Sequence, residues 1–239
     1  GDLLSALRLG LDAFLATELP LATGLGVPVI ASVAGDADGG FAPLAAAVGE
    51  RDEVAAVELN VSCPNVERRP VPLWADAGRV GAVVAASRET TGKPLWVKLS
   101  PAVTDIVPIA VAAERAGADA LVVANTIPGM RIDVDGRRPA VGNTTGGLSG
   151  RALLPINLSN VWKVAGEVSA PVVGSGGVST SDCVLEYLLA GAVVVQLGTV
   201  LFSDPSSAER IAAGLTERMV DDGIERIGDY VGLAREYAT

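Results

Sequence analysis

Six short runs of apolar residues recur along the chain, and each one predicts a β-strand that is buried on both faces. The runs are rich in Val, Leu, Ile and Ala and show no alternation of apolar with polar positions. Continuous apolar strands of this kind are typical of parallel sheets, whose two faces are both covered. The predicted strands span residues 27–34, 55–62, 94–99, 120–125, 171–173 and 193–197.

The segments between the apolar runs have the spacing of amphipathic helices. Residues 104–117 carry apolar side chains three and four positions apart, and residues 180–191 repeat the pattern. A helix typically starts after a capping Ser, Thr or Asp and ends at a glycine. The predicted caps and ends are Thr104 or Asp105 with Gly117, and Thr180 or Ser181 with Gly191. A further helix is predicted at residues 11–18.

Strands that alternate with helices predict βα units joined by right-handed crossovers. Neither a linker nor a low-complexity segment divides residues 1–239, so one domain is expected. Six strands suit an open doubly wound sheet, whereas a (β/α)₈ TIM barrel has eight and usually takes roughly 250 residues. If the fold is a barrel, about six of its eight βα units are visible and the N-terminal strands are absent from this sequence. Such a barrel exposes two unpaired strand edges.

Composition narrows the class of protein. The chain has 18 Lys and Arg against 28 Asp and Glu, for a net charge of −10, whereas nucleic-acid binding requires clustered positive charge. No apolar run reaches the roughly 18 residues that span a bilayer, and no signal peptide opens the chain. Two distant cysteines do not suggest a disulfide framework. We therefore expect a reduced cytoplasmic protein that binds neither nucleic acid nor membrane and holds no metal.

The segment ELNVSCPN at residues 58–65 places a thiol at the end of a predicted strand. Pro64 stops the strand because it has no N–H group to donate, so Cys63 lies at the carboxyl end of the strand, between Asn60 and Asn65. In parallel α/β proteins, ligands bind at the carboxyl ends of the strands. The chain has no histidine, the commonest general base, and Cys63 is therefore the candidate for proton transfer.

Polar side chains also end the next two strands. Lys98 lies within the apolar run 95–99, and a buried lysine is rare unless it is paired. A contact with an anionic or electron-rich ligand is favoured over a structural ion pair, and both remain open. Asn125 and Thr126 end the fourth strand, where amide groups suit a ring with alternating C=O and N–H groups. A single Asn at such a place is more often a turn former.

Glycines end the last two strands and predict a phosphate site. Residues 174–177 read Gly-Ser-Gly-Gly, and Gly198-Thr199 follows the final strand. In a barrel, bare backbone N–H groups of these loops commonly bind phosphate. A Rossmann site fits poorly, because its glycine fingerprint follows the first strand. The glycine-rich stretch 146–150 is either a flexible connector or part of the site.

Two other groups of residues are assigned no chemistry. Cys183 lies inside a predicted helix beside Val184 and Leu185, and we expect it to be a small buried apolar residue. The charged residues between 133 and 138 are expected to form a solvated hairpin, and they are Asp133, Asp135, Arg137 and Arg138.

Most of the chain, in collinear order, carries motifs of one known family. They are ELNVSCPNV at 58–66, VKLSPAVTDI at 97–106, NTIPGMRID at 125–133, NTTGGLSG at 143–150, VVGSGGVST at 172–180 and LLAGAVVVQLGT at 188–199. With these stretches the sequence strongly resembles the class 1 dihydroorotate dehydrogenases, which are FMN-dependent (β/α)₈ barrels of pyrimidine biosynthesis. The resemblance implies an oxidoreductase that converts (S)-dihydroorotate to orotate with FMN as the hydride acceptor.

The same resemblance implies roles for individual residues. Cys63 would be the base that removes a proton α to a carbonyl, while hydride leaves the neighbouring carbon for the flavin. The implied substrate-binding residues are Asn60, Asn65, Asn125 and Thr126. The implied flavin-binding residues are Lys98, Asn60, Gly147, Gly176, Gly177, Gly198 and Thr199.

The insert at residues 130–149 is similar to that of class 1B, whose catalytic subunit pairs with an iron–sulfur flavoprotein, and less similar to that of the fumarate-reducing class 1A. The implied partners are a second copy of the chain, in a homodimer, and an electron-transfer subunit with an iron–sulfur centre and FAD. The electron acceptor stays open between NAD through this partner, fumarate and another oxidant.

The opening of the chain departs from the family. Residues 3–11 look like the family's asparagine-containing loop with its middle missing, and no predicted strand precedes residue 27. Either residues of the protein are missing from this sequence, which we favour, or the protein is truncated and inactive. Two other functions stay open, namely a pyrimidine reductase of the dihydropyrimidine dehydrogenase type and a non-catalytic paralogue that serves as an interaction scaffold.

Overall fold

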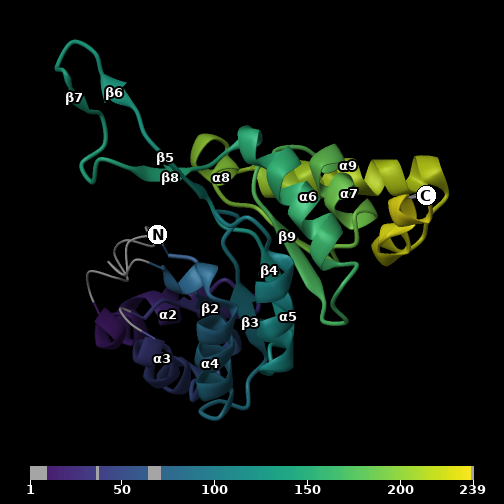
Figure 1. Cartoon of the computed structure of the whole chain (residues 1–239). Helices are drawn as coiled ribbons and strands as arrows, with labels where there is room; N and C mark the ends of the chain where they lie inside the picture. The colour runs from purple at the N-terminus through teal and green to yellow at the C-terminus, as the bar shows by residue number, and fades with distance from the viewer. Residues whose placement is uncertain (1–9, 36–37, 64–70, 238–239) are drawn as a thin grey trace.

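The computed structural model describes residues 10–35, 38–63 and 71–237, and its centre is a parallel sheet of six strands (Figure 1). All six predicted strands are confirmed. Their order in the sheet is β1-β2-β3-β4-β9-β10, so the strands lie side by side in the order in which they occur along the chain. They are β1 (Val29–Val33), β2 (Val54–Asn60), β3 (Leu95–Lys98), β4 (Ala120–Val123), β9 (Val172–Ser175) and β10 (Val194–Gln196).

The helices that connect the strands all cover the same face of the sheet. From α3 to α7, each α-helix contacts the next one along the chain, which requires these helices to lie side by side. A doubly wound sheet would divide them between two faces, so the structure is a partial (β/α)₈ barrel, as predicted. The α-helices are α2 (Leu19–Thr23), α3 (Phe41–Gly49), α4 (Ala77–Arg88), α5 (Val107–Arg115), α6 (Leu154–Val164), α7 (Ser181–Leu189), α8 (Val200–Ser203) and α9 (Ser207–Asp222). Short 3₁₀ or π segments are η1 (Phe14–Glu18), η2 (Asp38–Gly40), η3 (Leu73–Ala75), η4 (Arg151–Leu153), η5 (Ile227–Tyr230) and η6 (Leu233–Tyr237).

The curled sheet ends at β1 on one side and at β10 on the other. In the part of the chain that the structure describes, each of these strands pairs with a single neighbour. The expected unpaired edges are therefore present. The helix predicted at residues 11–18 is confirmed and continues to Thr23. The two explanations for the opening of the chain were based on residues 3–11. Of these, only residues 10 and 11 lie within the described part of the chain.

Local signals in the sequence place the ends of the helices. The Thr180 hydroxyl oxygen accepts the N–H of the third residue of α7 at 3.3 Å, as expected for a cap. Asp105 Oδ1 accepts the N–H of Val107 at 3.1 Å where α5 begins. Gly117 and Gly191 follow α5 and α7 with φ of +102° and +112°, a conformation that favours glycine. The predicted boundaries of α7 and the predicted end of α5 are confirmed, whereas the cap position of α5 is Ile106, one residue after Asp105.

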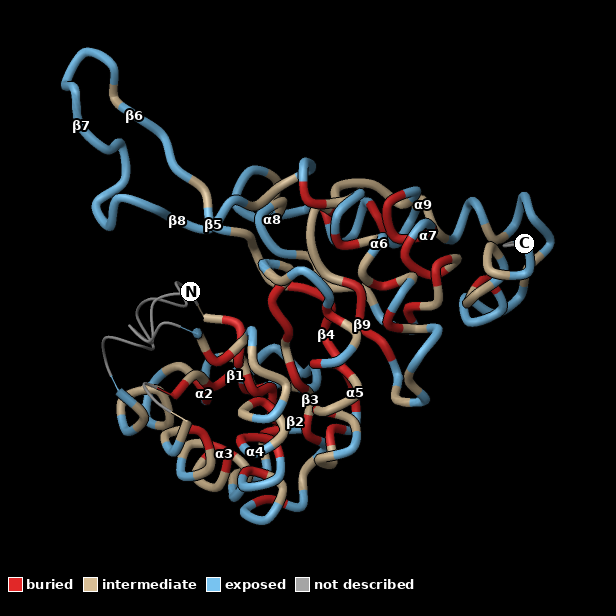
Figure 2. Tube along the Cα trace, viewed as in Figure 1, coloured by how far each residue is buried: buried red, intermediate tan, exposed pale blue. Residues whose placement is uncertain are grey.

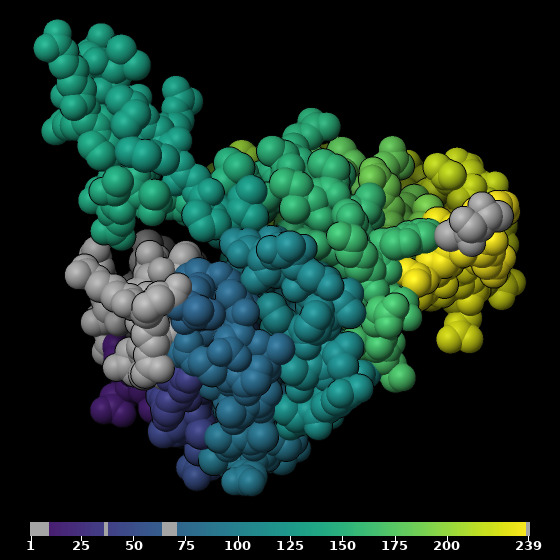
Figure 3. Space-filling view, in the orientation of Figure 1, coloured from purple at the N-terminus to yellow at the C-terminus, as the bar shows by residue number. Residues whose placement is uncertain are grey.

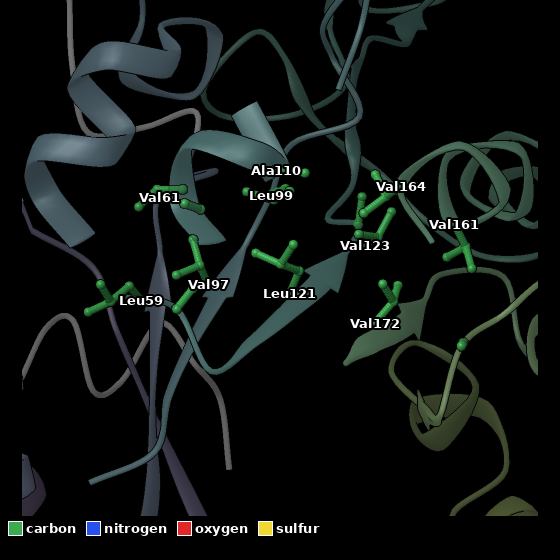
Figure 4. Close-up of a cluster of buried hydrophobic side chains, with 14 of the residues drawn as sticks. Leu59, Val61, Val97, Leu99, Ala110, Leu121, Val123, Val161, Val164 and Val172 are labelled. Carbon is green, nitrogen blue, oxygen red and sulfur yellow. The ribbon is translucent and has the colours of Figure 1, made fainter. Parts of the chain in front are cut away.

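The main hydrophobic core lies between the sheet and the helices (Figure 2). Alternate residues of each strand point toward the helices, and Leu59, Val97 and Leu121 are fully buried there, at 0% exposure. Figure 4 shows them in one cluster with Val161 and Val164 of α6. Burying a side chain of this size contributes about 1.5–3 kcal/mol to stability, so this layer holds the sheet in its curled form.

The remaining strand residues point to the concave face of the sheet. A small second apolar cluster consists of Ala120, Val122 and Val173, with Trp96 packed against it. Successive side chains of a strand alternate between faces, so Lys98, two residues beyond Trp96, points to this concave face as well. The polar groups of the concave face therefore lie close to the carboxyl ends of the strands.

Residues 127–148 form a double hairpin, here called the arm, that extends away from the body of the protein (Figures 1 and 3). β5 (Ile127–Gly129) pairs with β8 (Gly146–Leu148), and β6 (Ile132–Asp133) pairs with β7 (Arg138–Pro139). Of the two interpretations left open for residues 146–150, the flexible connector is wrong for 146–148, which pair as a strand. The solvated hairpin predicted for residues 133–138 is confirmed.

A carboxylate near the C-terminal end of α9 should make stability depend on pH. The Tyr230 hydroxyl donates to Asp222 Oδ2 at 2.7 Å, and the Arg218 guanidinium donates to the same oxygen at 2.8 Å. Together these two donors hold the pKa of Asp222 below its ordinary value. The pKa of an unfolded Asp is about 3.9. Because the folded pKa of Asp222 is lower, the ionised carboxylate stabilises the fold above about pH 3.9, and this contribution is lost as pH falls through the folded pKa. We expect Asp222→Asn to lower the melting temperature at pH 7, and the difference from the parent to shrink below about pH 4.

Thermal unfolding followed by circular dichroism at several pH values measures this difference. Asp221→Asn is the matched control, because the Asp221 side chain is exposed and its carboxylate forms no hydrogen bond or ion pair with another described residue. An Asp222→Asn protein whose deficit stays constant from pH 7 to pH 3 would contradict the prediction.

Candidate active site

The carboxyl ends of β3, β4, β9 and β10 surround a cavity of 160 Å³. Because the strands are parallel, their carboxyl ends share one edge of the sheet, and residues far apart in the sequence meet there. Asn60, Cys63 and Gly147 do not line the cavity, and Asn65 lies outside the described residues. The predicted site residues that line it are Lys98, Asn125, Thr126, Gly176, Gly177, Gly198 and Thr199.

Two of the predicted amides are held together by a serine that the sequence interpretation missed. Ser62, which is 3% exposed, donates to Asn60 Oδ1 at 2.6 Å and accepts from Asn125 Nδ2 at 2.8 Å. Asn125 Oδ1 in turn accepts the N–H of Thr126 at 2.8 Å. The Nδ2 group of Asn60 donates to no other described residue, so it is free to donate to a ligand. The position of Ser62 next to Cys63 was the only available signal for its role.

Cys63 follows β2 by three residues and is half-buried. Its neighbour Ser62 forms hydrogen bonds with Asn60 and Asn125. These bonds hold the backbone on the N-terminal side of Cys63 in place. The structure describes the chain again from residue 71 onward. The role of Cys63 as a base therefore stays a prediction. Cys183 is 7% exposed within α7, and the expectation of a small buried residue is confirmed.

Lys98 Nζ donates to Gln196 Oε1 at 3.2 Å across the concave face. Among the residues that the structure describes, no carboxylate forms an ion pair with Lys98, so the structural ion pair that was left open is not observed there. Gln196 also donates to Glu58 Oε2 at 3.2 Å, and Glu58 is buried. Gln196 lines the cavity with Lys98, and sequence reasoning gave it no role.

The turn after β9 is held by two side chains behind it. Asn157 Nδ2 donates to the carbonyl oxygen of Ser175 at 2.8 Å, and the Tyr187 hydroxyl donates to that of Gly176 at 2.8 Å. Gly176 and Gly177 have φ of +112° and +77°, which favour glycine. Both supporting residues were missed, although a buried Asn and Tyr in otherwise apolar helix faces are a signal for polar contacts.

The backbone at the two glycine turns is free to bind a ligand. The N–H groups of Gly176, Gly177, Gly198 and Thr199 donate to no other residue in the described part of the chain. Gly176 and Gly177 are half-buried, whereas Gly198 and Thr199 are exposed, and all four line the cavity. Free backbone N–H groups gathered around one cavity suit an anion. Burial raises the pKa of the nearby Tyr187 hydroxyl, so it remains a neutral donor.

Gly147 lies in the arm, beside Thr126 and outside the cavity wall. A Cβ at this position would collide with the Thr126 side chain, so the glycine allows β8 to pass close to the end of β4. Gly147 can therefore influence the site through Thr126, which does line the cavity.

The described residues offer neither a metal site nor a membrane span. No group of three or more His, Cys, Asp and Glu residues in those ranges is arranged to hold a metal ion. No helix in the same ranges is both long and apolar enough to cross a bilayer.

Comparisons with known proteins agree on one family. The family model described as dihydroorotate dehydrogenase matches residues 7–219. A protein of Trichlorobacter lovleyi named dihydroorotate dehydrogenase B (NAD(+)), catalytic subunit, is 45% identical over 235 residues, which cover 97% of this chain and 77% of that protein. The protein of the same name from Geobacter sulfurreducens is 46% identical over 235 residues, with the same coverage of 97% and 77%. That from Geotalea daltonii is 42% identical over 238 residues, which are 98% of this chain and 78% of the relative.

Proposed function

Because the chain belongs to the dihydroorotate dehydrogenase family, we propose that it oxidises (S)-dihydroorotate to orotate as a single FMN-binding domain. The observation that carries this proposal is the cavity at the carboxyl ends of the strands, which is lined by a lysine, the amide of Asn125 and two glycine turns. Names of the relatives support this reading over a pyrimidine reductase or a non-catalytic scaffold, neither of which they favour.

The residues of the cavity fit part of a flavin nucleotide. The unpartnered N–H groups of Gly176, Gly177 and Gly198 suit a phosphate group, and Lys98 suits the electron-rich end of a flavin ring. The volume of 160 Å³ is smaller than the roughly 300–1,000 Å³ of pockets that hold a whole ligand. We therefore assign the glycine turns to the phosphate and the lysine to the ring, which would extend toward Asn60.

The substrate would bind where the amides meet. A pyrimidine ring presents alternating C=O and N–H groups, and Asn60 and Asn125 provide donors and acceptors that Ser62 holds in fixed positions. We assign Asn65 and Thr126 to the same ring. Bound FMN supplies the acceptor for the hydride that leaves the substrate carbon next to the deprotonated one.

Cys63 would remove the proton α to the substrate carbonyl. It is the sole cysteine at a strand end, and its neighbour Ser62 bonds both asparagines that we assign to the ring. A base has to lie within about 3.2 Å of the proton it removes, directly or through one water. The proposed role therefore requires the Cys63 thiol to lie within this distance of the bound ring.

An anaerobic titration tests the proposed function. The purified protein is loaded with FMN, freed of excess cofactor, and mixed with dihydroorotate without oxygen. We expect the yellow absorbance to bleach, with one orotate formed for each flavin reduced. A protein that retains no FMN, or whose colour persists with excess dihydroorotate, would contradict the proposal, and bleaching by reduced NAD with uracil present would instead favour the pyrimidine reductase.

We infer that electrons leave through a partner subunit. The names of the relatives describe a catalytic subunit and NAD(+), which supports NAD as the final acceptor. An iron–sulfur cluster usually requires four cysteine ligands, and the chain has 2 Cys, so we assign the iron–sulfur centre and the FAD to a separate polypeptide. Copurification of a cysteine-rich flavoprotein, together with NAD reduction by the complex alone, would support this inference.

We further propose that a second copy of the chain binds at the arm. The arm exposes several large apolar side chains, which a protein normally covers with a partner. In Figure 3 the arm extends beyond the body of the protein, where another copy can reach it. These exposed residues are Met130 (50%), Ile132 (50%), Val134 (80%), Val141 (40%) and Leu148 (44%).

A charge on the arm should therefore weaken the dimer. Val134→Asp would bury an unpaired carboxylate in the proposed interface, and we expect the dimer dissociation constant to rise at least roughly tenfold. Val220→Asp on α9 is the matched control, because Val220 is 75% exposed against 80% for Val134. Light scattering over a dilution series measures the constant. A parent protein that is monomeric, or a Val220→Asp protein weakened equally, would contradict the arm as the dimer surface.

A further inference from the structure

Glu58 is a buried carboxylate whose partners are neutral. It is 4% exposed and lies on β2, directly opposite Ser32 in the register of β1 and β2. Ser32 Oγ donates to Glu58 Oε1 at 2.7 Å, and Gln196 Nε2 donates to Glu58 Oε2 at 3.2 Å. A buried charge is costly unless it is paired, so a cation within reach of this cluster should matter for Glu58.

Lys98 is such a cation, and Gln196 forms a hydrogen bond with each of the two charged groups. Its Oε1 accepts from Lys98 Nζ at 3.2 Å, while its Nε2 donates to Glu58 Oε2 at 3.2 Å. An ammonium group can only donate and a carboxylate can only accept, so these two partners leave a single orientation for the amide. The amide dipole then points its oxygen at the positive charge and its nitrogen at the negative charge.

The three side chains meet only because the sheet curls. Gln196 is on β10, which is separated from β3 by β4 and β9 in the order of the sheet. The bonds from Gln196 to Lys98 and Glu58 therefore cross the concave face. Both Lys98 and Gln196 line the cavity, whereas Glu58 does not. Through its two hydrogen bonds, Gln196 thus links the buried carboxylate of Glu58 to the ammonium group of Lys98 at the cavity wall.

We propose that Gln196 is a positioning residue that, together with Glu58, fixes the Lys98 ammonium at the end of the cavity assigned to the flavin ring. This inference rests on the proposed function. A flexible lysine side chain loses rotamer freedom when a bound cofactor fixes it. Gln196, which is itself bonded to Glu58, fixes the Lys98 side chain beforehand, so less of this entropic cost falls on cofactor binding. A fixed positive charge stabilises an electron-rich reduced ring more than the oxidised ring. Gln196 therefore helps to set the reduction potential of the cofactor through Lys98.

The test measures the midpoint potential of bound FMN in Gln196→Met, a variant of similar size that lacks both hydrogen bonds. We expect the affinity for reduced FMN to fall at least tenfold more than the affinity for oxidised FMN, which corresponds to a potential about 30 mV lower for a two-electron couple. Gln196→Asn keeps the amide but is one methylene shorter, so it should show the same direction of change and provides a second variant if Gln196→Met does not fold.

A double-mutant cycle separates positioning from general damage to the barrel. In a Lys98→Met background, Gln196→Met should cause no further shift of the potential, because Gln196 acts through Lys98. Asp119→Ala is the matched structural control. Asp119 accepts from the Leu95 N–H at 2.7 Å and from Arg88 at 2.8 Å, at the opposite ends of the strands. Its loss should lower the melting temperature and leave the potential unchanged.

The outcomes distinguish this inference from the function on which it rests. A parent protein that binds no FMN, or is not bleached by dihydroorotate, overturns both. A parent that is bleached, with an unchanged potential in Gln196→Met, overturns the positioning role alone. An equal shift in the Lys98→Met background, or in Asp119→Ala, also overturns it, because the effect would then not pass through Lys98.

Discussion

Replacing Cys63 by alanine should slow the reduction of bound flavin by dihydroorotate by roughly 10²–10⁴-fold, the usual contribution of a positioned general base. The proton α to the carbonyl then has no side-chain acceptor, and the sequence contains no histidine that could replace the thiol. Binding of FMN and of orotate should persist, because the asparagine pair and the glycine turns are untouched. Anaerobic stopped-flow measurement of flavin bleaching gives the rate directly.

Cys183 provides the matched control for this prediction. The chain has one cysteine at a strand end and one in α7, where Cys183 is 7% exposed. Burial alone would raise the pKa of the Cys183 thiol, but hydrogen bonds from Thr180 and Ser179 outweigh it and lower that pKa. Cys183→Ala should nevertheless leave the bleaching rate unchanged, because the residue is outside the cavity wall. A Cys63→Ala protein that is reduced at the parent rate would remove Cys63 from the mechanism.

The second large effect is expected at Gly177. Its φ is +77°, and a Cβ there would lie 2.5 Å from the backbone nitrogen of Leu154 and 2.8 Å from its Cα. Since the collision is with backbone at the start of α6, the turn itself has to move in Gly177→Ala. We expect a stability loss of roughly 1–3 kcal/mol from the strained conformation. We also expect at least a tenfold loss of FMN affinity, because the N–H groups assigned to the phosphate are displaced.

Gly223→Ala separates backbone strain from damage to the site. Gly223 ends α9 with φ of +66°, and a Cβ there would meet no heavy atom within 4 Å. This variant should lose stability through strain but bind FMN as the parent does. Melting temperatures at increasing FMN concentrations measure both quantities, because a ligand that binds the folded state raises the melting temperature with concentration. Parent-like stabilisation of Gly177→Ala by FMN would contradict the assignment of the phosphate site.

Much of the fold could be predicted because its signals are local. Continuous runs of Val, Leu and Ala identify strands covered on both faces, and all six are present. Thr180, Gly117 and Gly191 mark helix ends through contacts within a few residues or through their own backbone angles. The choice between a barrel and a doubly wound sheet was not local, because it depended on which face the helices cover.

The arm shows where local signals failed. Residues 146–148 contain two glycines and little side-chain hydrophobicity, so their composition suggests a connector. They form a strand because β5 lies opposite and supplies the hydrogen-bonding partners. Strand formation depends on the neighbouring strand and on burial, and composition alone therefore gives weak information about it.

The sequence by itself determined which residues stand at the ends of the strands, and hence that a thiol, amides, a lysine and glycines share one edge of the sheet. It did so because strand ends follow from local apolar patterns and every parallel strand ends on the same side. The tertiary structure alone decided which of these groups touch. Lys98 meets Gln196, 98 positions away in sequence, and Gln196 meets Glu58, 138 positions away. Contacts at such separations arise from the curl of the sheet, which no local pattern encodes.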